Sequence, residues 1–567
     1  MLKEIHFQNY KAFEKGSIKI KPITILLGAN SIGKTSLLQL FLMLQQTGLA
    51  SENYKSALKL HGGFLSLGEG KNIFRKQDPS KKLIFKIDFS ESSLIDFLKR
   101  QLIFRRYDEL LEYAGISQNI ILKQAHSNKE IHQIKNFFHR ERFNSRKEFK
   151  IDDKLIGEIN KILTLISEGT GQLKKMQKEK ILFEDYFYHR NPWLLRNIET
   201  KKEQIKDSFD FLISLSSKIK EDSTISVEYE IFLKENTLLI SNFKLYIDNE
   251  ILFDVNTGAS KDNSKFSFSI PSIEQKKIPP KFLETIKKRF VQPRTIFSFI
   301  NAEFDFEDNL KEDTPVLTDI ITQIISTTLG ELDNYFDEEN INYVSPLRAH
   351  PKRYYFLDKA KINTYLDTLD GDALAEILKE NGAIKKQVND WLKKFNLNIE
   401  VTNPQDILHK LTINQNELQL DITDVGFGIS QVLPVIIQGF LSFDDSITVI
   451  EQPEIHLHPK MQADLADLFI SIASKRKGKN IKSKNLIIET HSEYLLKRLR
   501  RRISEGTVKA DDVAIYVVKK NENTNFDNSI LEELNISDKG NFKYPEEFYG
   551  GDLLDDDIIF LQNQANI

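Results

Sequence analysis

The sequence predicts an α/β fold in which a mainly parallel sheet carries a phosphate-binding loop. Three observations lead to this prediction. Residues 23–36 read as a short apolar strand, a glycine loop and an apolar helix. Two further apolar strands, 446–451 and 485–489, each end in polar residues. Alternating strands at 224–255 and a segment rich in Lys, Glu, Leu and Ile at 92–222 predict an antiparallel β lobe and a largely helical insertion.

The composition excludes several classes of protein. The chain has 567 residues, enough for two to four domains or for one domain with a large insertion. A net charge of −3 gives no overall basic field, so any nucleic-acid contact must come from local patches. The absence of cysteine excludes disulfides, cysteine nucleophiles and cysteine-ligated zinc. With no run of about 18 apolar residues and no signal-peptide pattern, we expect a cytoplasmic protein with no membrane contact.

Residues 23–36, ITILLGANSIGKTS, have the pattern of a P-loop between a strand and a helix. Gly28 and Gly33 allow the backbone to curl so that successive N–H groups point at phosphate oxygens, and the following helix adds its positive N-terminal end. Lys34 can reach the β- and γ-phosphates, while the Thr35 hydroxyl can ligate Mg²⁺. We therefore expect the loop to bind a nucleoside triphosphate. The predicted binding residues are Gly28, Asn30, Ser31, Ile32, Gly33, Lys34, Thr35 and Ser36.

The segments around this loop alternate between strands and helices. Residues 1–27 predict two or three strands, and residues 83–89 alternate like a half-buried strand. Segment 92–222 predicts short helices or a helical hairpin, because no heptad pattern persists in it. The remaining expected elements are an antiparallel meander at 224–255, helices within 275–340 and 372–395, and strands within 398–421.

Three motifs near the C-terminus complete the predicted nucleotide site. The apolar strand 446–451 ends in Glu451, which fits a Walker B strand whose carboxylate holds Mg²⁺ directly or through water. Residues 485–489 form another buried strand, which runs into His491. Residues 424–431 form a glycine and serine turn that opens an apolar helix.

These motifs resemble those of ABC-type ATPases of the SMC, RecF and OLD group. The segment 451–459, EQPEIHLHP, is similar to their Walker B strand and D-loop, and residues 490–492, THS, are similar to their switch histidine. The turn 426–431, GFGISQ, occupies the place of their signature motif. With the Ser-Pro-Leu-Arg segment at 345–348, these motifs resemble a bacterial subgroup whose heads end in a short uncharacterised domain, and several of whose members are anti-phage ATPases such as the Septu type.

The resemblance covers residues 1–90 and 340–567 well and implies an ABC-type P-loop ATPase head that binds ATP and Mg²⁺. It also implies that two heads pair head-to-tail, each ATP lying between the P-loop of one chain and the signature turn of the other. We therefore expect a homodimer or a higher even homo-oligomer, in which His491 reports on the γ-phosphate. The metal ligands expected in this scheme are Thr35 and Glu451, and the signature residues are Gly428, Ser430 and Gln431.

One residue departs from the pattern of these ATPases. Many of them place a glutamate directly after the Walker B carboxylate, where it polarises the attacking water, but this chain has Gln452. An amide cannot act as a general base, although it can orient a water molecule. Either Glu454 assists hydrolysis, or the chain hydrolyses ATP slowly and works mainly as an ATP-gated clamp; we favour the second interpretation. The catalytic candidates are Glu451, Gln452, Glu454 and His491.

Two other groups of residues raise the alternative of a metal site. His456 and His458 lie beside two glutamates, but the surrounding sequence matches the D-loop pattern, which needs no metal. Asp552 and the three aspartates at 555–557 are compatible with a nuclease-type Mg²⁺ site, but a solvated acidic tail is the favoured interpretation.

Two basic clusters raise the question of nucleic-acid contact. In residues 137–147 a solvated helix face is favoured over such a contact, because charge runs usually have that origin. The helix after His491 carries five cations in six positions, and these repel one another unless anions lie near. DNA or RNA phosphates and acidic partners within the chain are equal alternatives there. The five cations are Lys497, Arg498, Arg500, Arg501 and Arg502.

The sequence leaves three functions open. The first is an ATPase that dimerises around ATP and regulates a separate effector, such as a nuclease, in prokaryotic anti-phage defence. The second is a RecF-like ATPase of DNA repair or chromosome maintenance, and the third is a scaffold that binds ATP without turnover. Neighbouring genes would separate the first two. The expected parts of the chain are the N-terminal half of the head (1–91), an insertion (92–340) whose meander within 224–270 can belong to the head, the C-terminal half of the head (341–510) and a short C-terminal domain (511–567).

Overall fold

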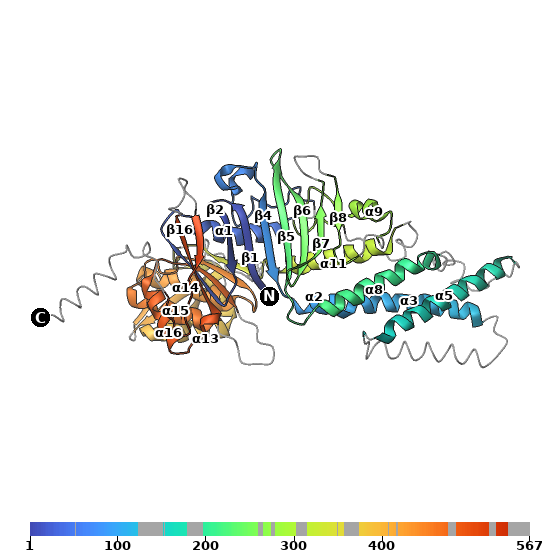
Figure 1. Ribbon diagram of the computed structural model, residues 1–567. Coiled ribbons are helices and arrows are strands. Elements are labelled where there is room, and N and C mark those ends of the chain that lie inside the picture. The colour runs from blue at the N-terminus through green and yellow to red at the C-terminus, as the bar shows by residue number, and fades with distance from the viewer. Residues whose placement is uncertain are drawn as a thin grey trace. The chain divides into compact units, whose positions relative to one another are not determined.

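The chain forms two compact units (Figure 1). The first comprises residues 1–87, 230–238 and 333–567, and the second comprises residues 88–229 and 239–332. The structure is a computed structural model. It describes residues 1–51, 53–122, 151, 153–178, 197–258, 265–273, 278–301, 314–348, 350–356, 373–405, 408–415, 418–473, 484–520 and 529–542.

A mainly parallel sheet forms the centre of the first unit. Its strands lie in the order β4-β1-β2-β17-β16-β3-β15-β14-β9. Neighbouring strands from β16 to β9 are parallel, whereas β1 pairs with β2 and β16 pairs with β17 in antiparallel fashion. The strands are β1 (Leu2–Tyr10), β2 (Phe13–Lys19), β3 (Ile23–Gly28), β4 (Leu83–Phe89), β9 (Ile341–Val344), β14 (Ile447–Glu451), β15 (Asn485–Glu489), β16 (Val513–Lys520) and β17 (Ser529–Glu533).

The three central strands β3, β14 and β15 are buried along their whole length. Apolar and β-branched residues dominate them, as expected of parallel strands covered on both faces. Ile23, Ile25 and Leu27 of β3 lie in a core that includes residues of helices α14 to α16. Since the carboxyl ends of parallel strands meet at one edge of a sheet, the residues that follow β3, β14 and β15 come together there.

Helices and a small second sheet complete the first unit. α1 packs against β3, β9 and β15, and α15 packs against β3, β15, α14 and α16. The second sheet has the order β10-β12-β11, with β13 paired to β12. These elements are α1 (Lys34–Gly48), α12 (Ala373–Glu380), α13 (Gly382–Leu392), α14 (Phe427–Leu441), α15 (Pro459–Ala473), α16 (Glu493–Ser504), β10 (Tyr355–Phe356), β11 (Leu397–Gln405), β12 (Leu408–Gln415) and β13 (Leu418–Asp421). Short helical turns are η1 (Gly70–Ile73), η2 (Arg75–Gln77), η5 (Asn334–Phe336), η6 (Lys393–Phe395) and η7 (Ala510–Asp512).

The second unit combines helices with an antiparallel meander. α3, α5 and α8 pack against one another and lie side by side in Figure 1. The turns of the meander contain Glu235-Asn236 and Asp248-Asn249, all with positive φ as a tight hairpin requires. The elements are α2 (Ser92–Asp96), η3 (Phe97–Gln101), α3 (Leu102–Leu122), α5 (Asp153–Lys178), α8 (Lys202–Lys218), β5 (Ile225–Lys234), β6 (Thr237–Ile247), β7 (Glu250–Asn256), β8 (Ser267–Ser269), α9 (Phe282–Arg289) and α11 (Val316–Asp333). The end of β5, the start of β6 with the turn between them, and the last residue of α11 belong to the first unit, whereas the last two residues of β4 belong to the second.

The predicted fold class is confirmed: the structure is α/β, with a mainly parallel sheet, an antiparallel β lobe and a largely helical insertion. The helices predicted within 372–395 are α12 and α13, and the strands predicted within 398–421 are β11 to β13. None of the helices in the described ranges has the length and apolar character needed to span a membrane.

Candidate functional site

The P-loop connects β3 to α1 in the first unit. Gly28 and Gly33 have φ of 140° and 113°, and Ser31 between them has φ of 64°. A Cβ atom at Gly28 would collide with the carbonyl oxygen of Val518 on β16, the register partner of Gly28, so this position requires glycine for close packing as well as for its φ. Asn30, Ser31 and Thr35 are exposed. The loop therefore presents backbone N–H groups and a hydroxyl at the first turn of α1.

Lys34 lies under the loop and is 3% exposed. Its Nζ donates hydrogen bonds to the carbonyl oxygens of Gly28 at 2.9 Å and Ala29 at 2.7 Å. Glu489 Oε1 lies 3.8 Å from the same nitrogen. Burial lowers the pKa of Lys34, and the charges of Glu489 and Glu454 oppose this shift. The ammonium group is thus held at the carboxyl ends of the central strands, where a phosphate would meet it.

Glu451 ends β14 and faces the same edge of the sheet. Its Oε1 accepts a hydrogen bond from the Tyr343 hydroxyl of β9 at 2.8 Å. Burial raises the pKa of Glu451, and the Tyr343 hydrogen bond opposes the rise. The sequence motifs did not point to Tyr343, because only the parallel pairing of β9 with β14 brings it beside the Walker B carboxylate.

The turn after β14 is fixed by contacts to β15 and to Arg348. Gln452 has φ of 43°, its N–H donates to Glu489 O at 2.8 Å, and its side chain is partly exposed. Arg348 is 6% exposed, and its guanidinium donates to the carbonyl oxygens of Glu451 at 2.9 Å, Gln452 at 3.2 Å and Gln431 at 3.3 Å. Burial lowers the pKa of Arg348 to about 10. Arg348 therefore joins the signature helix to the Walker B turn within one chain.

Glu454 binds the segment that carries the predicted switch histidine. Its Oε2 accepts from the Thr490 hydroxyl at 2.8 Å, and its Oε1 accepts from the His491 N–H at 2.6 Å. Burial raises the pKa of Glu454, and these hydrogen bonds oppose the rise. His491 is in contact with solvent. The protein around its ring and the charge of Lys34 still lower its pKa. Glu454 thus supports the turn at His491 with both of its carboxylate oxygens.

The predicted signature residues differ in accessibility. Gly426 is exposed and caps α14, and Gly428 is partly exposed. A Cβ atom at Gly428 would lie 2.7 Å from His456 O, so the signature turn packs against the D-loop of its own chain. Ser430 and Gln431 are buried. Only the glycine end of the predicted motif is open to a partner.

Comparison with known families identifies the chain. The AAA ATPase domain matches residues 1–496. The chain belongs to this family. Membership makes it an ATPase, and AAA ATPase domains bind ATP with Mg²⁺.

Solved structures similar to this AAA ATPase domain protein include two SMC heads. The SMC head domain from Thermotoga maritima has 8% sequence identity and a TM-score of 0.33, over 94% of this chain and 99% of that one. The Smc head domain from Pyrococcus furiosus, with an extended coiled coil and bound to the C-terminal domain of ScpA, has 10% identity and a TM-score of 0.31, over 94% of this chain and 96% of that one. No curated protein matches the sequence.

The residues of the AAA ATPase domain fit ATP with Mg²⁺. The curled P-loop and the buried Lys34 suit the phosphates. Thr35 offers a hydroxyl, and Glu451 offers a carboxylate at the same sheet edge, which are the oxygen ligands that Mg²⁺ prefers. Glu489 adds a buried carboxylate oxygen that has no hydrogen-bond partner in the described structure. The sequence motifs did not point to this residue. Its place at the end of β15 was the only sequence signal that could have found it.

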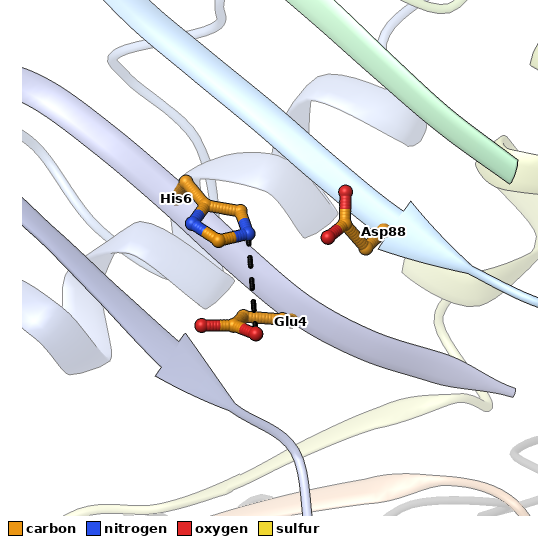
Figure 2. Close-up of side chains that lie close together, drawn as sticks. All are labelled: Glu4, His6 and Asp88. Atoms are coloured by element: carbon orange, nitrogen blue, oxygen red, sulfur yellow. Dashed lines mark ion pairs between the residues drawn. The ribbon is translucent and has the colours of Figure 1, made fainter. Parts of the chain in front are cut away.

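His456 and His458 do not form a metal-binding cluster with Glu454 in the described structure. His456 and His458 are exposed, His458 Nδ1 accepts from Lys460 N at 3.3 Å, and Glu454 is directed to Thr490 and His491. Within the described ranges the residues grouped closely enough for a metal are Glu4, His6 and Asp88, whose ligand atoms all lie within 4.8 Å of one another. Figure 2 shows these three side chains and the 4.0 Å ion pair between Glu4 and His6. In the sheet, β1 is separated from β3 by three strands, so Glu4 and His6 do not belong to the P-loop site.

The basic helix α16 has partners within the chain. Arg498 pairs with Asp464 and Asp467, and Arg502 pairs with Asp467 and Glu505. The exposed pairs are Lys497–Glu493 and Arg501–Glu505, and Arg500 lies over the ring of Phe542 at 5.3 Å. These contacts favour the acidic-partner interpretation over DNA or RNA contact. The basic cluster at 137–147 and the aspartates at 552–557 lie outside the described residues.

Proposed function

We propose that this AAA ATPase domain protein binds ATP at the P-loop, dimerises around the nucleotide and hydrolyses it slowly. One observation carries the proposal: Lys34, Glu451 and Glu489 meet where three adjacent parallel strands, β3, β15 and β14, end. ATP bound there would place its phosphates against the loop N–H groups and Lys34, with Mg²⁺ between the phosphates and the oxygens of Thr35 and Glu451.

Slow turnover is supported by the residue after the Walker B strand. Gln452 is an amide, which cannot accept a proton from water, and Glu454 uses both carboxylate oxygens to hold the Thr490–His491 turn. Dimerisation is supported by the exposed N-terminal end of α14, which offers backbone N–H groups to a phosphate of a second chain. His491, exposed beside Lys34, would sense the γ-phosphate.

The regulated process is proposed from the resemblance in sequence. It favours control of a separate effector, such as a nuclease, in prokaryotic defence, with the RecF-like role as the alternative. The cations of α16 have acidic or aromatic partners in their own chain, so this helix gives the RecF-like role no specific support. An effector gene beside this one would support the first role, and replication genes would support the second.

The test compares wild type with Lys34→Ala for ATP binding, ATP hydrolysis and molecular mass by light scattering. ATP should double the mass of the wild type, and the wild type should hydrolyse it. Lys34→Ala removes the ammonium group that donates to the loop carbonyls of Gly28 and Ala29, and it should lose at least about tenfold in ATP affinity together with the mass change. Unchanged binding and assembly in Lys34→Ala would show that the nucleotide site lies elsewhere.

A further inference from the structure

Glu489 lies on β15, between β3, which leads into the P-loop, and β14, which carries Glu451. It is the last residue of β15, and its register partners are Glu451 of β14 and Leu26 of β3. Residues directly opposite one another in a sheet project to the same face, so the carboxylates of Glu489 and Glu451 leave the sheet on one side. Glu489 Oε1 lies 3.8 Å from Lys34 Nζ. Its carboxylate therefore belongs to the lining of the P-loop.

One oxygen of this carboxylate is buried without a hydrogen-bond partner. Glu489 is 3% exposed, and its Oε2 is among the buried side-chain atoms that accept no hydrogen bond within the described part of the chain. Leaving a buried acceptor unsatisfied costs about 1–3 kcal/mol, and more when the group is charged. Most buried polar groups in proteins are paired, so an unpaired carboxylate oxygen beside a ligand site indicates a functional role.

The neighbouring carboxylates are already engaged. Glu451 accepts from the Tyr343 hydroxyl, and both oxygens of Glu454 accept from the turn at Thr490 and His491. Burial raises the pKa of Glu489 to about 7, with Lys34 opposing the rise and Glu451 and Glu454 adding to it. Glu454 uses both of its oxygens, and Glu451 is the proposed Mg²⁺ ligand, so Glu489 is the carboxylate of the three that is left for a water molecule.

We propose that Glu489 is the catalytic carboxylate of this slow ATP hydrolysis and acts from the end of β15, because the amide of Gln452 after the Walker B strand cannot accept a proton. The inference rests on the proposed function of the P-loop as an ATPase site. The oxygen of a water molecule forms a bond to the γ-phosphorus, and the bond from that phosphorus to the bridging oxygen breaks, its electron pair leaving on ADP. The proton of the water passes to Glu489 Oε2, which later releases it to solvent.

The experiment separates hydrolysis from binding. Glu489→Gln keeps the size of the side chain but removes its basicity, and it should lower turnover at least about 100-fold. The affinity for a fluorescent ATP analogue should stay within about threefold of wild type, since Lys34 and the loop are intact. Gln452→Ala removes the neighbouring amide, which can orient a water molecule but cannot accept a proton, and it should lose less than about tenfold in turnover. Melting temperatures of the nucleotide-free proteins establish that both variants are folded.

A second variant makes the role of the proton acceptor visible. Glu489→Ala leaves space for a small carboxylate, and formate should restore turnover at least about tenfold, whereas it should not rescue Lys34→Ala. Turnover of Glu489→Gln within about threefold of wild type, or a larger loss in Gln452→Ala than in Glu489→Gln, would overturn the inference and leave the proposed function standing. A wild type that neither binds nor hydrolyses ATP would overturn the proposed function, and the role of Glu489 with it.

Discussion

Asp333 is a residue whose burial predicts a pH dependence of stability. Its Oδ1 is buried without a hydrogen-bond partner in the described structure, close to Gly48 of α1. Burial raises the pKa of Asp333 to about 6, and the charge of Asp337 adds to the rise. Between about pH 4 and about pH 6 the folded chain therefore keeps a proton on Asp333 that the unfolded chain has lost. As a result, the free energy of unfolding falls as the pH rises through this range.

Asp333→Asn should remove this dependence. We expect a gain of about 1–2 kcal/mol in the free energy of unfolding at about pH 8, after allowance for partial exposure, and a gain that shrinks as the pH falls through 6 towards 4. Urea unfolding of the two proteins at several pH values measures it. Asp337→Asn, at an exposed position in the same turn, is the control and should change stability less. A gain that grows as the pH is lowered would contradict the assignment.

At the same scale, short motifs in the sequence predicted several of the candidate site residues. Lys34, Glu451 and His491 follow from short local patterns, and the structure brings them to one edge of the sheet. Tyr343 and Glu489 were missed, because their relation to the site depends on which strands become neighbours. The cations of α16 could not be assigned either, since their acidic partners on α15 are identified only by the packing of the two helices.

The packing of α15 against α16 depends on a partly buried group of charges. Asp467 of α15 pairs with both Arg498 and Arg502, and its side chain is 14% exposed. Burial alone would raise the pKa of Asp467, but Arg502 and Arg498 hold it below its usual value. Asp467→Asn should therefore cost about 2 kcal/mol, because two guanidinium groups lose their shared carboxylate.

Thermal unfolding of the full chain measures this effect. Arg501→Gln is the control on the same helix, since the pair that it breaks is exposed, and it should change the melting temperature little. If Asp467→Asn were as stable as Arg501→Gln, the cations of α16 would not need their partners on α15. DNA binding by α16 would then regain support.

Among the larger elements, strands and turns were more predictable than their order in the sheet. The meander at 224–255 was predicted, because the alternation of apolar and polar residues along its strands is a local signal. In contrast, β16 lies directly beside β3, although Val513 and its register partner Ile23 are 490 positions apart in the sequence. Parallel pairing between distant segments leaves no signature in the sequence of either strand.

At the scale of the whole molecule, the proposed dimer can be tested by complementation. Gly426 is exposed at the start of α14, has φ of −48°, and a Cβ atom there would meet nothing within 4 Å. Gly426→Glu therefore fits its own chain but places a negative charge where a phosphate of a second chain would bind. Gly428 is unsuitable for this purpose, because its Cβ would lie 2.7 Å from His456 O. The matched control is Gly382→Glu, another exposed glycine with open space, at the start of α13.

Lys34→Ala and Gly426→Glu should each be inactive alone, whereas Gly382→Glu should hydrolyse ATP like the wild type. If each site combines the P-loop of one chain with the signature turn of another, each mixed dimer has one complete site of two, whereas a dimer of either variant alone has none. The mixture should then recover about one quarter of wild-type hydrolysis if the chains pair at random, and up to about one half if neither variant assembles alone. No recovery would place both halves of the site in one chain, and full activity of Gly426→Glu alone would remove the signature turn from the site. Recovery would require two chains for every turnover, so the P-loop would hydrolyse ATP only in the assembled protein.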